Sequence, residues 1–539
     1  MTAARGPAGT CGPGETAGPS SGETAGPDVA GERQWRASAQ AAEYQPAAEL
    51  TYTQLVESLA GLPGQAVLTQ AASQDWPGLL RLADAARGWL HRLDVPAGSP
   101  VAALLVTSAE AIALALAGAA AGRPLAPMGP RLTERELAPC VRGIGAQVLV
   151  ADPRYAAIAE RVAAAAGVRL ALLDGFGGGT AVPHQAGTAG PGMSDVGAIL
   201  HTSGTTGLPK AVPMTQRTLA QRVVVNARLL QLGPDSRYAS ASPFHHIAGW
   251  GNVAVALGAG ATIVPFPDFT VAAWPQLGEL GVTHALLVPT MIEMLLAQGT
   301  LRLGSLRVLQ YGAAPIHPDT LRRAMSMLPG VTFVDIYGQT EGSPLTCLTA
   351  EDHRQAAAGR EYLLESVGRA VPGVELQIAE PTPDGVGELL ARGPHLNYLD
   401  ADGWQHTGDL GWLDEEGYLY LAGRKGDMII RGGENVYPLE VENVLAGHPQ
   451  VAGVAVIGVP DQRLGEAVKA YVVPASPDTP PDFTELRAFA RRVLAGFKVP
   501  EIWELTASLP HNPNGKLMRS ELAKRAAAAG GGSGAVKTG

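Results

Sequence analysis

Short apolar segments alternate with helical patterns along most of this sequence, and that alternation restricts the fold more than any other feature. Strands are predicted at residues 101–106, 147–151, 196–201, 261–264, 285–288, 308–311 and 332–336, and helices at 109–121 and 155–166. Apolar strands separated by helices are typical of α/β layers with mostly parallel strands. We therefore expect an α/β fold of layered sheets and helices.

The pattern changes after Val386. Short strands separated by Gly and Asp-Gly turns are predicted at 388–392, 411–414 and 418–422, so this part should be rich in β-structure. Beyond Arg424, Pro438 opens a helix. Strands follow at 451–459 and 467–473, and a second helix at 482–494. These segments predict a smaller α+β domain.

The expected division of the chain follows from these patterns. A large N-terminal domain is expected at 46–423, a hinge at 424–428 and a small, mobile C-terminal domain at 429–526. The ends, 1–45 and 527–539, are rich in Gly and Ala and are expected to be disordered tails. A chain of 539 residues exceeds one ordinary hydrophobic core, which agrees with at least two domains.

Charge and cysteine content exclude several classes of protein. The chain has 40 basic and 50 acidic residues, and its net charge of −10 disfavours binding to nucleic acid. The three cysteines, Cys11, Cys140 and Cys347, form no CxxC pair, so neither a disulfide framework nor a zinc site is expected. Because no signal sequence and no membrane span are apparent, we expect a cytoplasmic protein.

The most specific string is HTSGTTGLPK, which follows the apolar strand at 196–200. Its glycines allow close approach to a ligand, its hydroxyls can donate hydrogen bonds, and Lys210 adds a positive charge, a combination that suits a polyphosphate. It is not the GxxxxGK[ST] loop, and a Ser/Thr/Gly turn alone would be read as a flexible polar turn. The candidate phosphate contacts are Thr202, Ser203, Gly204, Thr205, Thr206, Gly207 and Lys210.

TSGTTGLPK resembles the signature of the adenylate-forming superfamily, which includes acyl-CoA synthetases, peptide-synthetase adenylation domains and luciferases. The resemblance extends from roughly Leu50 to Leu522. Further family-like strings, in the family's order, are PMGPRLTEREL, FHHIAG, YGAAP, IYGQTEG, HTGDLG, GRKGDMIIRGGENVYPLEVE and NPNGKLMR. The resemblance implies the family's fold and a two-step reaction, in which an acid and MgATP form an acyl-adenylate and a thiol then displaces AMP.

The resemblance also implies roles for single residues. Tyr337 is expected to stack on adenine, Thr340 to bond the α-phosphate and Glu341 to hold Mg²⁺. Asp409 is expected to accept hydrogen bonds from the ribose, with Arg424 beside it. Read alone, each would be an ordinary turn or cap residue. The remaining candidate contacts to ATP or CoA are Gly312, Ala313, Ala314, Asp335, Gly338, Gly432 and Gly433.

Two further residues are candidates for catalysis. Lys516, in an Asn-Pro-Asn-Gly-Lys turn, matches the family lysine that enters the active site. A cation there could lower the barrier to attack on the α-phosphorus by about 3–4 kcal/mol. His246 in FHHIAG matches the family histidine near the carboxylate. A purely structural role is equally compatible with this histidine, and a lysine after Asn-Gly is normally just solvated.

Two positions depart from the family pattern. The glycine that usually follows the phosphate-loop lysine is Ala211. Two residues after Arg424, where relatives often carry Lys or Asp, the chain has Gly426. This is the expected pivot between the half-reactions, and glycine there allows wide φ/ψ sampling. It could also be an ordinary turn glycine.

These features predict an acyl-CoA synthetase that uses ATP, Mg²⁺, CoA and a carboxylic acid. CoA is preferred because no carrier domain is fused and only a short tail follows the small domain. Loading of a separate holo-carrier protein is the alternative with the same fold. Intact Lys210, Glu341, Asp409 and Lys516 disfavour a catalytically silent nucleotide-binding protein, and a luciferase-type oxygenase is a weaker alternative.

The acyl group is the least determined feature. FHHIAG lacks the aspartate that amino-acid-activating relatives use, which disfavours an amino acid and leaves aliphatic, aromatic, polyketide and terpenoid acids open. The segments expected to line the acyl pocket are 244–251, 288–291, 311–315 and 339–345. They contain no Arg or Lys to pair a second carboxylate, and an unpaired one would be costly to bury. We therefore predict monocarboxylic acids of moderate to large size.

Overall fold

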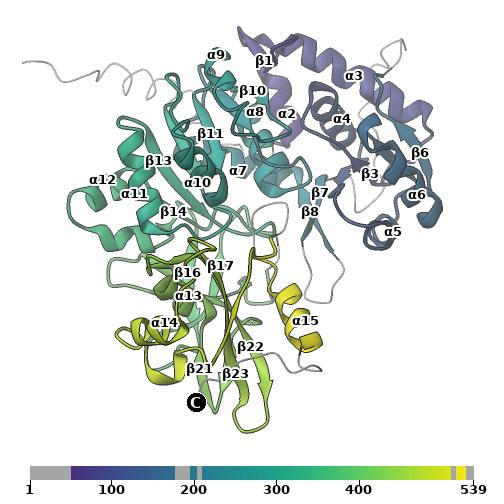
Figure 1. The fold of residues 1–539 in the computed structure, drawn as a ribbon. Helices are drawn as coiled ribbons and strands as arrows, with labels where there is room; N and C mark the ends of the chain where they lie inside the picture. Colours follow the sequence, from purple (N-terminus) through teal and green to yellow (C-terminus); the bar gives the residue numbers. More distant parts are fainter. Residues whose placement is uncertain (1–49, 177–194, 203–208, 398, 512–516, 530–539) are drawn as a thin grey trace, which may run out of the picture. The chain divides into compact units, whose positions relative to one another are not determined.

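The computed structural model describes residues 50–176, 195–202, 209–397, 399–511 and 517–529. Within these ranges the chain forms a large N-terminal α/β domain and a small C-terminal domain (Figure 1), which confirms the predicted fold class. The predicted tail at 1–45 lies outside the described residues. So does most of the second tail, although the last helix continues to Ala529.

One sheet of the large domain contains the strand that leads to HTSGTTGLPK. Its order is β6-β5-β3-β4-β7-β8, parallel except for β8. The strands are β3 (Val101–Leu104), β4 (Leu125–Pro127), β5 (Val148–Ala151), β6 (Arg169–Leu172), β7 (Val196–Thr202) and β8 (Lys210–Thr215). The helices between them are α4 (Ala109–Ala120), α5 (Glu134–Gly143) and α6 (Ala156–Ala166). Helix α4 is apolar on nearly all sides and is buried, as expected of such a helix.

The second sheet of the large domain has nine strands in the order β15-β14-β13-β12-β11-β9-β10-β1-β2. The strands from β13 to β1 run parallel, and the edge strands are antiparallel. Their bounds are β1 (Gln65–Leu68), β2 (Ser73–Asp75), β9 (Arg237–Ser240), β10 (Thr262–Pro265), β11 (His284–Leu287), β12 (Val308–Tyr311), β13 (Thr332–Tyr337), β14 (Thr346–Leu348) and β15 (Arg369–Ala370). The carboxyl ends of β12 and β13 therefore meet at one edge of the sheet and place YGAAP beside YGQTEG.

The helices of this part of the large domain bury the apolar residues of the nine-stranded sheet. They are α2 (Tyr52–Glu57), α3 (Trp76–Arg92), α7 (Gln216–Leu229), α8 (Asn252–Gly258), α9 (Gln276–Glu279), α10 (Pro289–Ala297), α11 (Pro318–Met327) and α12 (Ala350–Ala357). Between α7 and α8 lies a π-helix, η3 (Ile247–Gly251), which begins immediately after His246. Single-turn π-helices are rare and are frequent at functional sites.

The predicted β-rich part is a four-stranded antiparallel sheet. Its strands are β16 (Glu375–Ala379), β17 (Gly387–Arg392), β18 (Gln405–Leu413) and β19 (Leu419–Arg424). Strand β18 begins six residues before the predicted strand at 411–414, so that the string HTGDLG lies within the ladder instead of in a turn. The register of this sheet pairs Asp409 with Arg424.

The small domain combines a sheet with three helices. Its elements are β20 (Ile429–Arg431), β21 (Glu434–Val436), α13 (Pro438–Ala446), β22 (Val451–Asp461), β23 (Gly465–Pro474), α14 (Phe483–Ala490), β24 (Ile502–Leu505) and α15 (Arg519–Ala529). Helix α14 ends four residues before the predicted Leu494, and turns replace its last part. No helix in the described part of the chain is long and apolar enough to cross a bilayer.

Candidate active site

Three polar side chains surround the carboxylate of Asp409. Its Oδ2 accepts hydrogen bonds from the Tyr337 hydroxyl at 2.6 Å and from the Gln339 amide at 2.7 Å. Its Oδ1 lies 2.9 Å from Nε of Arg424. Asp409 is only 6% exposed, and burial of a carboxylate is costly unless donors surround it. The three donors therefore hold this carboxylate in a fixed position.

The β18–β19 ladder provides the backbone for this cluster. Asp409 and Arg424 are direct partners across the ladder, next to a bulge between Leu410 and Gly411. The backbone N–H of Asp409 donates to the Thr407 hydroxyl at 3.1 Å, and that hydroxyl donates to the Leu389 carbonyl at 2.7 Å. Both sides of the Asp409 backbone are thus anchored within the sheet.

A tight turn after β13 places Tyr337 and its neighbours. The N–H of Gln339 donates to the Gly342 carbonyl at 2.7 Å, and the N–H of Gly342 donates back at 3.2 Å. A Cβ at Gly338 would lie 2.7 Å from Cβ of Ser343, so the turn can close only around glycine. Burial and the Asp409 carboxylate hold the pKa of Tyr337 well above its usual range, so the phenol remains a donor.

The residues after β12 form a thin wall beside this turn. Gly312 has a φ of +140°, and a Cβ there would lie 2.8 Å from Oδ1 of Asp335. Ala313 has a φ of +65°, a strained conformation for a residue other than glycine. Burial raises the pKa of Asp335 to about 7, which places a group able to accept or donate at this wall. Gly312, Ala313 and Ala314 thus present little side-chain bulk at this wall.

The end of strand β7 meets the same turn. The Thr202 hydroxyl donates to Oε1 of Glu341 at 3.3 Å. Thr202 pairs with Lys210 of β8 across the antiparallel ladder. Thr340, the residue before Glu341, is buried, with 7% of its surface exposed. The fold therefore brings the end of β7 to the YGQTEG turn through Thr202, and Lys210 lies beside Thr202 in the ladder.

His246 lies on a third side of the site. It precedes η3, and with Met291 and Ala313 it lines a small cleft, whose other residues are Ser242, Pro243, Ala248 and Val288. The neighbouring His245 turns away and approaches Gly129, where a Cβ would lie 3.1 Å from Nε2. Burial and His246 lower the pKa of His245 to about 3, so it is neutral. The two histidines diverge, as expected for adjacent residues of an extended segment.

Several predicted site residues are not brought into this cluster. Ser203, Gly204, Thr205, Thr206, Gly207 and Lys516 lie outside the described residues. Gly432 and Gly433 form the β20–β21 turn of the small domain, where the N–H of Gly432 donates to the Leu464 carbonyl at 2.7 Å. Among the described residues, no hydrogen bond connects this turn to Asp409.

Sequence reasoning missed two residues. Gln339 was expected only to line the acyl pocket, but its amide also donates to the Thr407 carbonyl at 2.6 Å and so links the turn to β18. Arg222 of α7 lies outside all four expected pocket segments, yet its Nη2 would be 3.7 Å from a Cβ at Gly251. The segments themselves contain no Arg or Lys, but this cation of α7 lies beside one of them. The sequence around Gln339 and around Arg222 does not indicate which distant residues each of them contacts.

The described residues fit a Mg²⁺ ion that binds together with ATP better than a metal ion held by protein groups alone. Among them, no group of three or more His, Cys, Asp and Glu side chains could hold a metal ion. Mg²⁺ usually binds through one or two carboxylates together with substrate phosphates, and Glu341, beside Thr202 at the end of β7, is a carboxylate that could serve in this way. The flat wall at 312–314 and the buried Asp409 fit a nucleobase and a ribose.

Comparison with known proteins gives a consistent result. Residues 56–397 match the family model described as AMP-binding enzyme, and residues 440–516 match the AMP-binding enzyme C-terminal domain. The chain is 35% identical over 475 residues to indoleacetate–CoA ligase of Aromatoleum aromaticum, covering 82% of this chain and 90% of that one. It is 34% identical over 440 residues to the fatty acid–[acyl-carrier-protein] ligase ScoC of Streptomyces coeruleorubidus, covering 76% and 83%.

Solved structures agree with the sequence relatives. The amide bond synthetase McbA from Marinactinospora thermotolerans superposes with a TM-score of 0.79 at 29% identity, over 88% of this chain and 99% of that one. The o-succinylbenzoate coenzyme A synthetase from Bacillus subtilis, solved with ATP and magnesium ion, gives a TM-score of 0.77 at 27% identity, over 87% and 98%. The names of these similar proteins indicate different acyl acceptors: CoA, an acyl-carrier protein and an amine that forms an amide.

Proposed function

The chain belongs to the AMP-binding enzyme family, and from this premise we propose that it is an AMP-forming acyl-CoA synthetase. It activates a carboxylic acid with ATP to an acyl-adenylate and then transfers the acyl group to CoA. The Asp409 cluster carries this proposal, because it joins three strings that are far apart in the sequence into one site for a nucleoside.

Asp409 and its neighbours account for binding of the nucleoside. A carboxylate offers about four acceptor positions, and Tyr337, Gln339 and Arg424 occupy three of them. One position is left for a ribose hydroxyl. The hydrogen bond to Asp409 fixes the hydroxyl end of Tyr337, and its ring would stack on adenine.

Residues at the other end of the site account for activation of the phosphate. Lys210 and the hydroxyl groups of the TSGTTGLPK hairpin would hold the phosphates, and Glu341 would hold Mg²⁺. When bound there, Mg²⁺ would neutralise phosphate charge and stabilise the departing pyrophosphate. Thr340 would donate to the α-phosphate, and His246 would border the attacking carboxylate. Lys516 would offset the charge that develops when two anions approach each other.

The second step requires a different arrangement of the small domain. Lys516 and the turn at Gly432 and Gly433 cannot both occupy the site, so a hinge at 424–428 must change its backbone conformation. In the described conformation Asp427 N–H donates to the Arg424 carbonyl at 3.0 Å, which closes a turn over Lys425 and Gly426. A Cβ at Gly426 would meet no atom within 4 Å, so this conformation does not itself require glycine.

The relatives also support a second acceptor. ScoC is named a ligase for acyl-carrier protein, and its identity to this chain is close to that of the CoA ligase from Aromatoleum aromaticum. One assay separates the two functions. Pyrophosphate release with a panel of acids identifies the activated acid, and thioester formation is then measured with CoA and with a holo-carrier protein. Transfer to the carrier protein alone would contradict the CoA assignment.

A further inference from the structure

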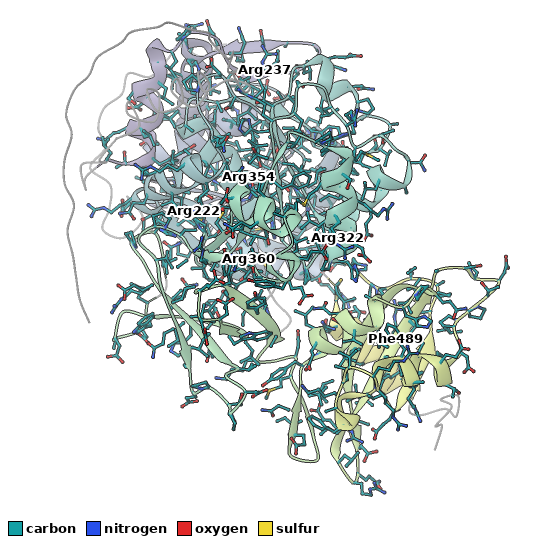
Figure 2. All side chains as sticks on the ribbon, turned by 90° about the vertical axis from the view of Figure 1, so that its left-hand side faces the viewer. Arg222, Arg237, Arg322, Arg354, Arg360 and Phe489 are labelled. Atoms are coloured by element: carbon teal, nitrogen blue, oxygen red, sulfur yellow. The ribbon has the colours of Figure 1, made fainter. Side chains whose placement is uncertain are left out.

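Arg222 is a buried cation for which the described residues supply no counter-charge. Its side chain is 2% exposed, and neither Nε nor Nη1 makes a hydrogen bond within the described part of the chain. The other arginines labelled in Figure 2 all have partners, which are the Leu280 carbonyl for Arg237 and the carboxylates of Asp319, Glu351 and Glu416 for Arg322, Arg354 and Arg360. These four also lie nearer the solvent, where a partner is needed less.

An unpaired buried guanidinium is energetically unfavourable. Even after relaxation, removing an ion from water costs several kcal/mol unless a counter-charge compensates it. Burial lowers the pKa of Arg222 to about 10, so the side chain still carries its charge at neutral pH. No carboxylate of the described residues lies within ion-pair distance of it. The missing counter-charge must come from outside this part of the chain.

The position of Arg222 relates it to the acyl site. Its Nη2 lies 3.7 Å from where a Cβ would stand on Gly251, the last residue of η3. The residue before η3 is His246, which lines the cleft together with Ala313 and Met291. Arg222 therefore lies beside the last residue of η3, whereas His246, which borders the expected position of the reacting carboxylate, precedes its first residue.

Other polar atoms near Arg222 also lack partners. Burial, together with the nearby charge of Arg222, lowers the pKa of His395. Its Nε2 donates to the Pro344 carbonyl at 2.7 Å, and its buried Nδ1 has no partner in the described residues. Two residues further on, Nδ2 of Asn397 also lacks one, and Asn397 is tied to α7 by the Thr218 hydroxyl at 2.9 Å. Buried polar atoms are nearly always hydrogen-bonded, so several unsatisfied ones beside one cation indicate a site for a polar ligand.

We propose that Arg222 binds a second carboxylate of the acid substrate, so that the preferred acids carry one carboxylate at each end of a medium-length chain. This inference rests on the proposed function and replaces the expectation of monocarboxylic acids. A guanidinium can bind a carboxylate through two parallel hydrogen bonds, and this gives both charge pairing and orientation. Short diacids such as malonate would not reach from the reacting position to Arg222.

Matched acids and matched variants test the proposal. ATP–pyrophosphate exchange is measured with octanedioate and with octanoate for the wild type, Arg222→Met, Arg222→Lys and Arg228→Met. Arg228 is exposed on the same helix, so Arg228→Met removes a charge without touching the site. We expect the wild type to favour octanedioate and Arg222→Met to lower the octanedioate-to-octanoate ratio of kcat/KM by about 100-fold or more. Arg222→Lys should retain part of the preference, and Arg228→Met all of it.

Thermal unfolding of the ligand-free variants separates binding from a structural role. Since Arg222→Met removes an unpaired buried charge, its Tm should equal or exceed that of the wild type. A lower Tm with an unchanged ratio of the two acids would show that Arg222 is structural and would overturn the inference. Absence of exchange with octanedioate would also overturn it. Failure of the chain to bind ATP in calorimetry would instead contradict the proposed function.

Discussion

The hydroxyl of Tyr337 donates a 2.6 Å hydrogen bond to Oδ2 of Asp409, although the two residues are 72 positions apart in the sequence. This bond joins the nine-stranded sheet of the large domain to the four-stranded sheet. Gln339 donates to the same oxygen, and Arg424 binds the other one. The proposed ribose site is thus assembled from two sheets, and each contact in it can be removed separately.

Tyr337→Phe should weaken ATP binding and leave the fold intact. The substitution keeps the ring but removes the hydroxyl that orients it, so we expect KM for ATP to rise by roughly 5- to 20-fold, in line with one hydrogen bond to a charged group. Asp409→Asn should have a larger effect, because it also removes the charge that Arg424 faces. Tyr362→Phe is the control, since Tyr362 is an exposed tyrosine whose hydroxyl contacts Arg360. Equal KM values for Tyr337→Phe and Tyr362→Phe would contradict the assigned role.

Glu341→Gln should lower the affinity for the Mg²⁺ that adenylation requires. The amide retains an oxygen near the Thr202 hydroxyl but loses the charge that attracts the cation. We expect the Mg²⁺ concentration for half-maximal pyrophosphate exchange to rise by about tenfold or more, a loss of metal affinity typical of removing a group that holds or orients a metal ligand. Glu351→Gln, a change at an exposed carboxylate that binds Arg354, should leave the Mg²⁺ titration unchanged. A similar rise in both variants would exclude a specific metal site at Glu341.

Lys516→Ala should separate the two half-reactions. The cation is needed while the phosphorus is attacked, so adenylation should fall by about 100-fold or more. Thioester formation from supplied acyl-adenylate should be much less affected, because the small domain has then turned away. Lys524→Ala, which removes a lysine paired with Glu521, serves as the control. Equal losses in the two half-reactions of Lys516→Ala would mean that this lysine has a structural role.

Gly426→Pro and Gly426→Ala should behave differently. Gly426 is the second central residue of the turn that Asp427 closes onto Arg424, where proline displaces the preceding residue from its helical conformation. Because a Cβ at 426 meets no atom within 4 Å, alanine should be accepted. We expect Gly426→Ala to retain both half-reactions and Gly426→Pro to slow thioester formation from acyl-adenylate by at least about tenfold. Wild-type rates in both variants would place the pivot elsewhere within 423–428.

Arg519→Met should destabilise the small domain. Arg519 binds both carboxylate oxygens of the buried Glu442, donates to the Val456 carbonyl at 2.9 Å and lies 3.4 Å from Asp427 of the hinge. Removing one partner of a buried ion pair costs about 3–5 kcal/mol, because the other charge remains buried. Urea unfolding followed by tryptophan fluorescence should show this loss. The double change Arg519→Met with Glu442→Leu should recover part of it, and no recovery would argue against a dominant role of the unpaired charge.

The sequence by itself determined the α/β class, the β-rich part, the small domain and most strand positions. Apolar periodicity and turn residues are local properties, and strands such as 308–311 were predicted to the residue. The family could also be identified from the sequence, because several strings with the family's residue spacing occur in the family's order. The assignment of Thr202, Tyr337, Asp409 and Arg424 to one nucleotide site stays a prediction, while the described contacts join Tyr337 and Arg424 to Asp409, and Thr202 to Glu341.

Only the tertiary structure decided which distant side chains share a partner. The pairing of Asp409 with Arg424 and the bond from Gln339 to Thr407 depend on strand register, which a string of residues does not specify. The burial of Arg222 depends on the packing of α7 against η3, two segments whose own sequences give no sign of an unpaired charge. Contacts between separate elements arise from packing, and for that reason the nature of the acyl pocket could be inferred only after the fold was known.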